Sequence, residues 1–264
     1  MMNIACQTIV FGDNIKDTFT EIAKTLKEIG YDGIETGARH FYLDRAGFYQ
    51  DLLGALDMQL IAIHVGGNFL DKDSVRKQLD NVSNIISFSR KLGCSYLYLS
   101  GHYYEGKTRN DYADEAVSYT EIGKMCANEG LVLCYHNHDW EFKNKAEGMK
   151  ALLDNVPAEL MKLVPDVGWI EIAGTSSLQF LKDNIDRIEA LHFKDFKGPD
   201  QFTELGTGIV PFRDLYTYIC GLNRRQTKTW WISAEQDRST LEPQEAARIN
   251  FTYLDGLRKE IQGG

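Results

Sequence analysis

The sequence is poor in residues that would cross-link the chain or carry it across a membrane. It has five cysteines, an odd number, and no two of them are separated by only two residues: Cys6, Cys94, Cys126, Cys134 and Cys220. A disulfide framework or a structural zinc site is therefore not expected, and a reducing compartment fits best. No run approaches the roughly 18 apolar residues of a membrane-spanning helix, and the N-terminus has no signal segment. We expect a cytoplasmic protein without membrane contact, although a leader already removed would not be visible.

Positive charge and linker composition are also scarce. The chain has 29 lysines and arginines against 38 acidic residues, which gives a net charge of -9. Nucleic acid is therefore not an expected partner, because neutralising phosphates requires a basic face. No Pro/Gly/Ser-rich linker, low-complexity tract or internal repeat interrupts the 264 residues. We predict that residues 1–264 form one domain.

Short β-rich runs alternate with amphipathic stretches along the chain. The β-rich runs occupy eight ranges: 3–10, 33–36, 59–65, 96–100, 131–137, 162–167, 188–195 and 230–236. Between them, residues 17–30, 72–93 and 111–130 repeat apolar side chains every three and four positions, which predicts helices. Each of these stretches closes on a glycine that suits a helix C-terminus: Gly30, Gly93 and Gly130. Eight strands alternating with helices predict an α/β fold, a single (β/α)₈ TIM barrel.

Ionisable side chains gather at the C-terminal ends of the predicted strands. In a barrel these ends meet at one mouth, where the chemistry takes place. From strand two to strand eight they are Glu35, His64, His102, His136, His138, Glu141, Asp166, His192, Lys194, Glu235 and Asp237. A lone histidine or acid at a strand end is usually a hydrogen-bonded core residue or a helix cap. The whole set indicates function, because burying several acids together is costly unless a cation or protons offset them.

The composition of this set predicts one bound divalent ion. Carboxylates with imidazole and without thiolate favour Mn²⁺, Mg²⁺ or Co²⁺, with Zn²⁺ as an alternative. An oxygen-rich site leaves coordination positions open, and these can chelate neighbouring oxygens of a sugar. The ion would then act as a Lewis acid on a carbonyl.

Four ordered motifs at the ends of strands five to eight carry a family resemblance. They are YHNHDWEF (135–142), PDVGW (165–169), LHFKDF (191–196) and SAEQD (233–237). In this order they resemble the sugar phosphate isomerase/epimerase family, the xylose-isomerase-like TIM barrels, whose relatives include ketose 3-epimerases, inosose dehydratases and, more distantly, endonuclease IV. The resemblance covers essentially the whole chain. It implies a metal-dependent enzyme that acts on a small-molecule sugar or keto-sugar.

The family's metal ligands are a glutamate, an aspartate, a histidine and a second glutamate, and they carry over unevenly. Asp166, His192 and Glu235 match the last three. The first is missing, because Tyr135 or His136 stands where the epimerases have a strand-end glutamate. The resemblance therefore implies three ligands and leaves the fourth open.

The fourth ligand is sought in the strand-five segment. Glu141 falls where the epimerases carry a glutamate that faces the substrate, and we predict that it binds the metal instead. The alternatives are that His136 or His138 is the ligand, or that water completes three protein ligands. A second departure is Trp169, which stands where epimerases commonly have histidine and offers a sugar ring a face to stack on.

These departures affect the predicted reaction. A ketose 3-epimerase uses two opposed carboxylates, one removing a proton from carbon and one returning it on the other face, while the metal holds the enediolate. One of the two is absent from its usual place here, and the histidine-rich end resembles inosose dehydratases and enzymes of 3-keto-glycosides. We predict metal-assisted proton abstraction next to a sugar carbonyl. Isomerase/epimerase is the leading reaction, and lyase/hydratase is the alternative.

Roles for individual residues follow from this reaction. Glu235 is predicted as metal ligand and general base, with His136 or His138 as the acid or second base, because imidazole titrates near neutral pH. Lys194 shares a strand face with His192 and would hydrogen-bond a substrate oxygen or the developing enolate. The predicted substrate-binding residues are Glu35, His64, His102 and Trp169.

Other functions and features remain as alternatives. A non-catalytic sugar-binding barrel would keep the pocket without the base. A DNA-repair enzyme like endonuclease IV would need more metal ligands for its three zinc ions and a less acidic chain. Residues 206–212, GTGIVPF, are either a phosphate cradle or a tight turn into a helix with Pro211 at its first position. Dimers or tetramers are common among acidic members of the family, so a homo-oligomer is one expectation.

Overall fold

Strands and helices alternate along the computed structural model, which describes residues 2–223 and 229–262. The strands are β1 (Met2–Gln7), β2 (Gly33–Gly37), β3 (Gln59–Gly66), β4 (Tyr96–Ser100), β5 (Val132–Tyr135), β6 (Lys162–Leu163), β7 (Leu191–Phe193), β8 (Asp195–Gly198), β9 (Gln201–Thr203) and β10 (Trp230–Ala234). The helices are α1 (Ile15–Ile29), α2 (Ala46–Ala55), α3 (Val75–Lys91), α4 (Arg109–Asn128), α5 (Lys143–Asn155), α6 (Val167–Ile172), α7 (Ser177–Asn184), α8 (Phe212–Asn223) and α9 (Pro243–Gln262). Short 3-10 turns are η1 (Thr8–Phe11), η2 (Ala38–His40), η3 (Trp140–Phe142) and η4 (Ile185–Arg187).

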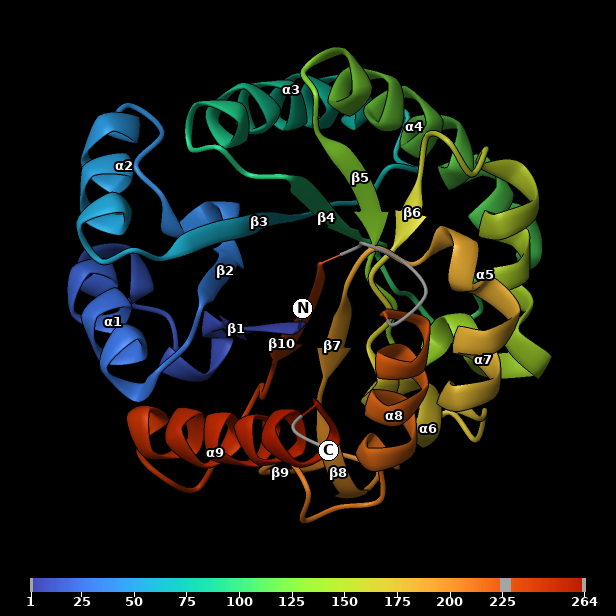
Figure 1. The fold of residues 1–264 in the computed structure, drawn as a ribbon. Helices are drawn as coiled ribbons and strands as arrows, with labels where there is room; N and C mark the ends of the chain where they lie inside the picture. Colours follow the sequence, from blue (N-terminus) through green and yellow to red (C-terminus); the bar gives the residue numbers. More distant parts are fainter. Residues whose placement is uncertain (1, 224–228, 263–264) are drawn as a thin grey trace.

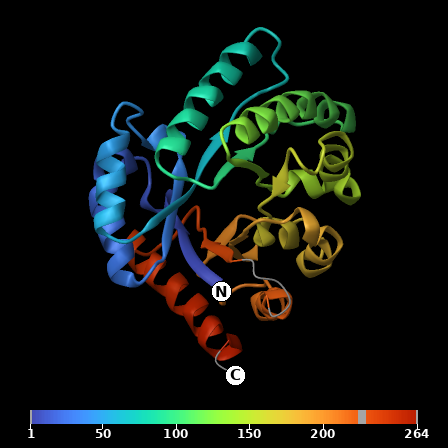
Figure 2. The same ribbon diagram turned by 45° about the horizontal axis from the view of Figure 1, so that its top comes forward.

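Eight of the strands form one curled parallel sheet. Their order is β6-β5-β4-β3-β2-β1-β10-β7. Backbone bridges from Leu163 to Ile188 and from Asp166 to His192 join its two edges, so the sheet closes into a barrel. The helices lie outside the strands in both views (Figures 1 and 2). The predicted α/β TIM barrel is confirmed, and the extent of the domain over residues 1–264 stays a prediction.

The helices bury one face each against the barrel. In α1, for example, Phe19 and Leu26 are buried while charged residues such as Lys24 face solvent. The three glycines predicted to end helices all have positive φ, as a left-handed cap requires: Gly30, Gly93 and Gly130. The first and last helices, α1 and α9, lie side by side and complete the ring (Figure 1). None of the helices within the described residues combines the length and apolar character needed to cross a bilayer.

The barrel interior below the mouth is filled by side chains. The inner core consists of Ala5, Ile61, Ala62, Tyr98, Cys134, Val164, Ala190 and Trp231. Inward-facing residues of a small barrel pack in this way, so the centre is a core and not a pore. The ring of Tyr98 lies edge-on to the rings of His64 and His192, with centroids 5.2 and 5.6 Å apart. The inner core therefore forms the floor on which the mouth residues rest.

Strand boundaries differ from the sequence-based ranges mainly in the second half of the barrel. The range 96–100 is correct, but 162–167 shortens to β6 and 188–195 to β7. Asp166 caps helix α6, and Asp195 begins the antiparallel hairpin β8–β9, which was not predicted. When a polar residue directly follows an apolar run, the sequence does not show whether the strand continues through it, because the groups that bond to that residue lie elsewhere in the chain.

Candidate active site

The end of strand β5 sends successive side chains to different places. His136 points into the barrel mouth, where its Nε2 meets the ends of β7 and β10. The Asn137 side chain accepts a hydrogen bond from the Asp166 N–H at 3.0 Å and donates to the Asp166 carbonyl at 3.2 Å. His138 stands at the rim with its ring stacked on Trp140, centroids 4.0 Å apart. The asparagine thus ties β5 to the segment after β6, and the histidines on either side of it are held at the mouth.

Five buried side chains from four strand ends meet in the mouth, and we call them the central cluster: His136, Asp166, His192, Lys194 and Glu235. His136 Nε2 lies 3.0 Å from His192 Nδ1 and 3.1 Å from Glu235 Oε2. Glu235 Oε2 also contacts His192 Nδ1 directly. Lys194 Nζ lies 3.1 Å from Asp166 Oδ2 and 3.0 Å from Glu235 Oε1. These contacts join the ends of β5, β6, β7 and β10 into one network.

The position of Asp166 follows from the helix behind it. Its Oδ1 accepts hydrogen bonds from the N–H groups of Gly168 at 2.9 Å and Trp169 at 3.1 Å, as the N-cap of α6. Its Oδ2 is left to face Lys194. A Cβ at Gly168 would lie 2.2 Å from the Lys194 carbonyl oxygen, so glycine is needed for α6 to approach β7 this closely. The PDVGW motif is thus a capped helix start that aims a carboxylate at the mouth.

The acids of the central cluster attract positive charge strongly. Burial disfavours the imidazolium of His192, but Glu35 and Glu235, which both contact its ring, raise its pKa to about 10. Burial likewise opposes the Lys194 ammonium, but Asp166, Glu235 and Asp237 hold its pKa well above the usual range. Asp237 Oδ2 lies 2.7 Å from Lys194 Nζ. A place that retains cations against the cost of burial has the electrostatics of a metal site.

The donor atoms of the central cluster fit a divalent ion. His136, Asp166, His192 and Glu235 each offer one ligand atom, and these atoms lie within 4.8 Å of one another. All four residues are buried. Two carboxylate oxygens and two imidazole nitrogens suit borderline ions such as Zn²⁺, Mn²⁺ or Co²⁺.

Glu141, the predicted fourth ligand, does not join the central cluster. Its Oε1 accepts a hydrogen bond from the Tyr135 hydroxyl at 2.7 Å, and its Oε2 accepts one from the His138 N–H at 2.8 Å. Burial raises its pKa to about 7, although both hydrogen bonds oppose this shift. The structure brings His136, one of the alternatives, to the other three predicted ligands. Side chains alternate along a strand, so Tyr135 faces outward and His136 inward.

Glu141 belongs to a second buried polar group, which lies between β5 and α4. We call it the outer cluster: Lys107, Glu115, Tyr119, Tyr135 and Glu141. Lys107 Nζ lies 2.6 Å from Glu115 Oε2, and their side chains are 1% and 0% exposed. The rings of Tyr119 and Tyr135 have centroids 5.7 Å apart. Lysine, hydroxyl and backbone donors from this chain already pair with its two acids.

A cavity of about 230 Å³ opens above the central cluster, and we call it the inner cavity. Predicted residues that line it are His64, His136, His138 and Glu235. Glu35 lies below it, fully buried, with Oε1 2.6 Å from His192 Nε2 and 3.4 Å from His64 Nε2. Glu35 therefore orients an imidazole of the cluster, as an acid beside a metal-binding histidine commonly does.

Two other predicted substrate-binding residues lie away from this lining. His102 is exposed on the loop after β4, where its carbonyl accepts a hydrogen bond from Lys107 Nζ at 2.7 Å. Trp169 is half-buried, and Lys194 Nζ sits 4.9 Å from the centroid of its ring. Trp169 thus packs on the cluster's lysine instead of presenting its face to the cavity. Residues that sequence reasoning missed, Gln7, Arg39 and Ser100, line the cavity without belonging to any motif.

The GTGIVPF segment holds a carboxylate of its own chain. The N–H groups of Gly206 and Gly208 each donate to Asp195 Oδ2 at 2.9 Å, and Val210 N–H donates to Oδ1 at 3.2 Å. A phosphate bound here would need the same backbone N–H donors, and the Asp195 carboxylate already occupies them. The segment is therefore a turn, with Pro211 directly before α8.

Comparison with known proteins places the chain in a family. Residues 18–256 match the family model described as xylose isomerase-like TIM barrel. The chain belongs to this family. It is 24% identical over 272 aligned residues to an inosose dehydratase of Bacillus velezensis, covering 90% of this chain and 89% of the relative.

Solved structures with the same fold resemble this xylose isomerase-like barrel over nearly its whole length. An L-ribulose 3-epimerase superposes with a TM-score of 0.81 and 15% identity over 99% of this chain and 97% of its own. The IOLI protein, solved with a bound zinc atom, gives a TM-score of 0.79 and 15% identity over 98% and 99%. At these identities the likeness shows the fold alone.

Proposed function

We propose that this xylose isomerase-like barrel is a metal-dependent dehydratase of a cyclic keto-sugar. It removes a proton from the carbon next to the carbonyl and expels a neighbouring hydroxyl as water. Support comes from the central cluster beneath the inner cavity and from the similarity to an inosose dehydratase over 90% of the chain. The wider reaction, proton abstraction next to a sugar carbonyl, is shared with the epimerases of the family.

The observation that carries this proposal is what faces Glu235 across the cavity. In the ring of strands β10 lies opposite β4, so Ser100, with His64 and His138 from the strands beside it, faces Glu235. Inversion at carbon requires acid–base groups on both faces of the sugar. The second carboxylate, Glu141, is bonded within the outer cluster. Glu235 is proposed to hold the ion and pairs with Lys194, so proton transfer falls to His138 on one side, which fits this cavity better than epimerisation.

The residues proposed to hold the ion are His136, Asp166, His192 and Glu235. When bound, a divalent ion supplies a Lewis acid that polarises the substrate carbonyl. The two imidazoles move our expectation from Mg²⁺ toward Zn²⁺, Mn²⁺ or Co²⁺. Lys194 positions Glu235 by pairing with its Oε1 at 3.0 Å.

His138 is the proposed proton carrier. It lines the inner cavity, its ring is held by stacking on Trp140, and its Nδ1 has no hydrogen-bond partner among the described residues. An imidazole that takes the proton from carbon can return it to the departing hydroxyl on the same face. The products are water and a carbon–carbon double bond next to the carbonyl, so the atoms balance without a second base.

The proposal is tested by following metal-loaded protein with an inosose and with a free ketose in D₂O by NMR. We expect the inosose to lose water and the ketose to keep its configuration. Solvent deuterium entering the ketose with inversion and without loss of water would make the protein an epimerase. Binding of both sugars with neither exchange nor water loss would make it a sugar-binding barrel.

A further inference from the structure

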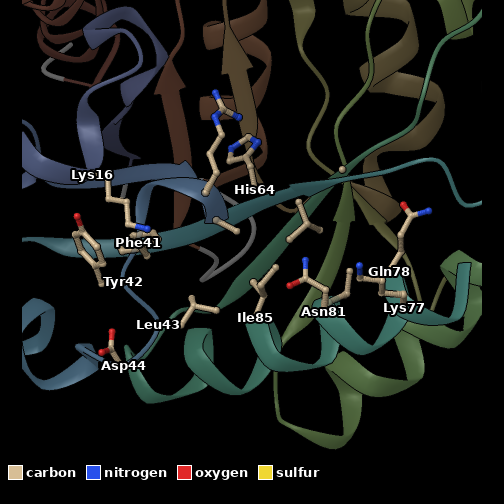
Figure 3. A pocket seen from close by; sticks show the side chains of 15 residues that line it. Lys16, Phe41, Tyr42, Leu43, Asp44, His64, Lys77, Gln78, Asn81 and Ile85 are labelled. Carbon is tan, nitrogen blue, oxygen red and sulfur yellow. The ribbon is translucent and has the colours of Figure 1, made fainter. Parts of the chain in front are cut away.

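A larger cavity adjoins the inner one, and we call it the outer cavity. Its volume is about 850 Å³. The two cavities share the lining residues Arg39, His64, Val65 and Gly66. Figure 3 shows His64 above, residues of the segment after η2 on one side, and α3 on the other. A molecule held above the central cluster can therefore extend past His64 into the outer cavity.

The sizes of the two cavities indicate different occupants. Pockets for drug-sized ligands usually span about 300–1,000 Å³. The inner cavity, at about 230 Å³, lies below this range, and the outer one, at about 850 Å³, lies well within it. A single sugar ring at the central cluster would leave the outer cavity to a second part of the same molecule.

The outer cavity is positively charged in an acidic protein. Lys16, Arg39 and Lys77 line it against one carboxylate, Asp44, whereas the whole chain has a net charge of -9. Lys16 Nζ lies 4.0 Å from the centroid of the Tyr42 ring. Within the described residues none of the three cations forms an ion pair, so their charge is available to a ligand.

The rest of the lining is largely apolar. Phe41, Val65, Val82 and Ile85 contribute to it, and each of these is buried in the protein core on its other side. A bare phosphate would gain little from such a surface, because it needs donors on several sides. A flat, carbon-rich group with one negative charge would use both the apolar wall and the cations.

We propose that the outer cavity binds an acidic, partly apolar substituent of the substrate, of the arylcarboxylate type. The substrate is then a keto-sugar that carries this group, with the sugar above the central cluster and the acid near Arg39 and Lys16. This inference rests on the proposed function, since it takes the inner cavity as the place of the sugar.

Two matched probes test this binding without requiring turnover. They are 4-carboxyphenyl β-glucopyranoside and its uncharged amide, 4-carbamoylphenyl β-glucopyranoside, each titrated by calorimetry into metal-loaded protein at low salt. We expect the dissociation constant of the carboxylate to be about ten-fold lower, because the two probes differ mainly in charge. Raising the ionic strength should shrink this preference, because the cations lie at an open surface.

Substitutions test whether Arg39 and Lys16 cause the preference for the carboxylate probe. Arg39→Met and Lys16→Met remove charge and keep length, and each should reduce the ten-fold preference to about three-fold or less. Lys24→Met is the control, because Lys24 is an exposed lysine of the same helix as Lys16 that lines neither cavity. It should leave the preference unchanged. Thermal midpoints should match in all variants, because none of the three side chains is buried.

Equal dissociation constants for the two probes, or a preference that survives in the Lys16→Met/Arg39→Met double variant, would overturn the proposal. Failure of the proposed function is a separate result. If the probes show the preference but no keto-sugar loses water, the outer cavity stands and the dehydratase assignment falls. If an inosose loses water but both probes bind equally, only the outer-cavity proposal falls.

Discussion

The central and outer clusters both bury carboxylates completely, yet they differ in what surrounds those acids. In the outer cluster each acid already has donors of its own chain, since Lys107 pairs with Glu115, and Tyr135 and a backbone N–H pair with Glu141. In the central cluster two imidazoles and two carboxylates each offer a ligand atom, and these atoms lie within 4.8 Å of one another beneath a cavity. Buried acid alone therefore does not indicate function, whereas convergence of several ligand atoms beneath an opening does.

The same contrast appears in the charge of two glutamates. Burial raises the pKa of Glu141 to about 7, because its hydrogen bonds and the charge of Lys107 offset only part of this shift. Burial acts the same way on Glu235, but Lys194, His136 and His192 together hold its pKa well below the usual range. The environment of Glu141 therefore favours the neutral acid, and that of Glu235 favours the carboxylate.

The largest expected effect separates the two clusters at their shared strand. His136→Asn should abolish near-stoichiometric metal binding and turnover, whereas Glu141→Gln should keep the metal. The reason is that His136 offers a ligand atom to the central cluster and Glu141 is bonded elsewhere. Elemental analysis after dialysis measures the metal content of both variants. Metal lost from Glu141→Gln and retained by His136→Asn would restore Glu141 as the ligand.

The next effect concerns catalysis without metal loss. His138→Asn should retain the metal and lose about 10²- to 10⁴-fold in kcat, the usual contribution of a general acid–base group. The change is measured by steady-state kinetics with the metal content of the same sample. Trp140→Phe is the control, because a phenyl ring can still stack on His138. A rate within three-fold of the parent protein for His138→Asn would remove His138 from the mechanism.

In the outer cluster the expected effect is on stability. Lys107→Met leaves the fully buried Glu115 without its cation and should cost about 3–5 kcal/mol of unfolding free energy. The double variant Lys107→Met/Glu115→Gln should recover much of this loss, because it removes the unpaired charge. Urea titration measures both, and the metal content per folded chain should not change. A single variant as stable as the parent would show that the pair is solvated.

The smallest expected effect is a pH dependence. The folded chain keeps the Glu141 proton up to about pH 7, while the unfolded chain releases it near 4.5, so the folded state binds more protons between these values. Stability should therefore fall as pH rises through this window, by roughly 3 kcal/mol from this group. Glu141→Gln should show a correspondingly smaller loss in urea titrations at pH 5 and pH 7. Parallel losses in both proteins would show that Glu141 does not titrate there.

Much of the barrel and part of its mouth could be predicted because the signals are local. Apolar periodicity predicted β4 correctly over 96–100 and indicated eight barrel strands in all, since each strand or helix shows its buried face in its own residues. Asp166, His192 and Glu235 were expected together because parallel strands end at one rim. Their convergence in the central cluster agrees with this topology.

Only the tertiary structure decided which strand-five residue joins them and what lies beside the site. Past the end of β5 no periodic pattern determines where a side chain points. Glu141 turns outward because its carboxylate accepts hydrogen bonds there from the Tyr135 hydroxyl and the His138 N–H. The outer cavity is lined by Lys16, Arg39 and Lys77, which come from three separate segments of the chain. No spacing in the sequence indicates that these three residues lie together. Local pattern sets which face of an element is buried, whereas the partner of a polar group beyond its element depends on contacts distant in the chain.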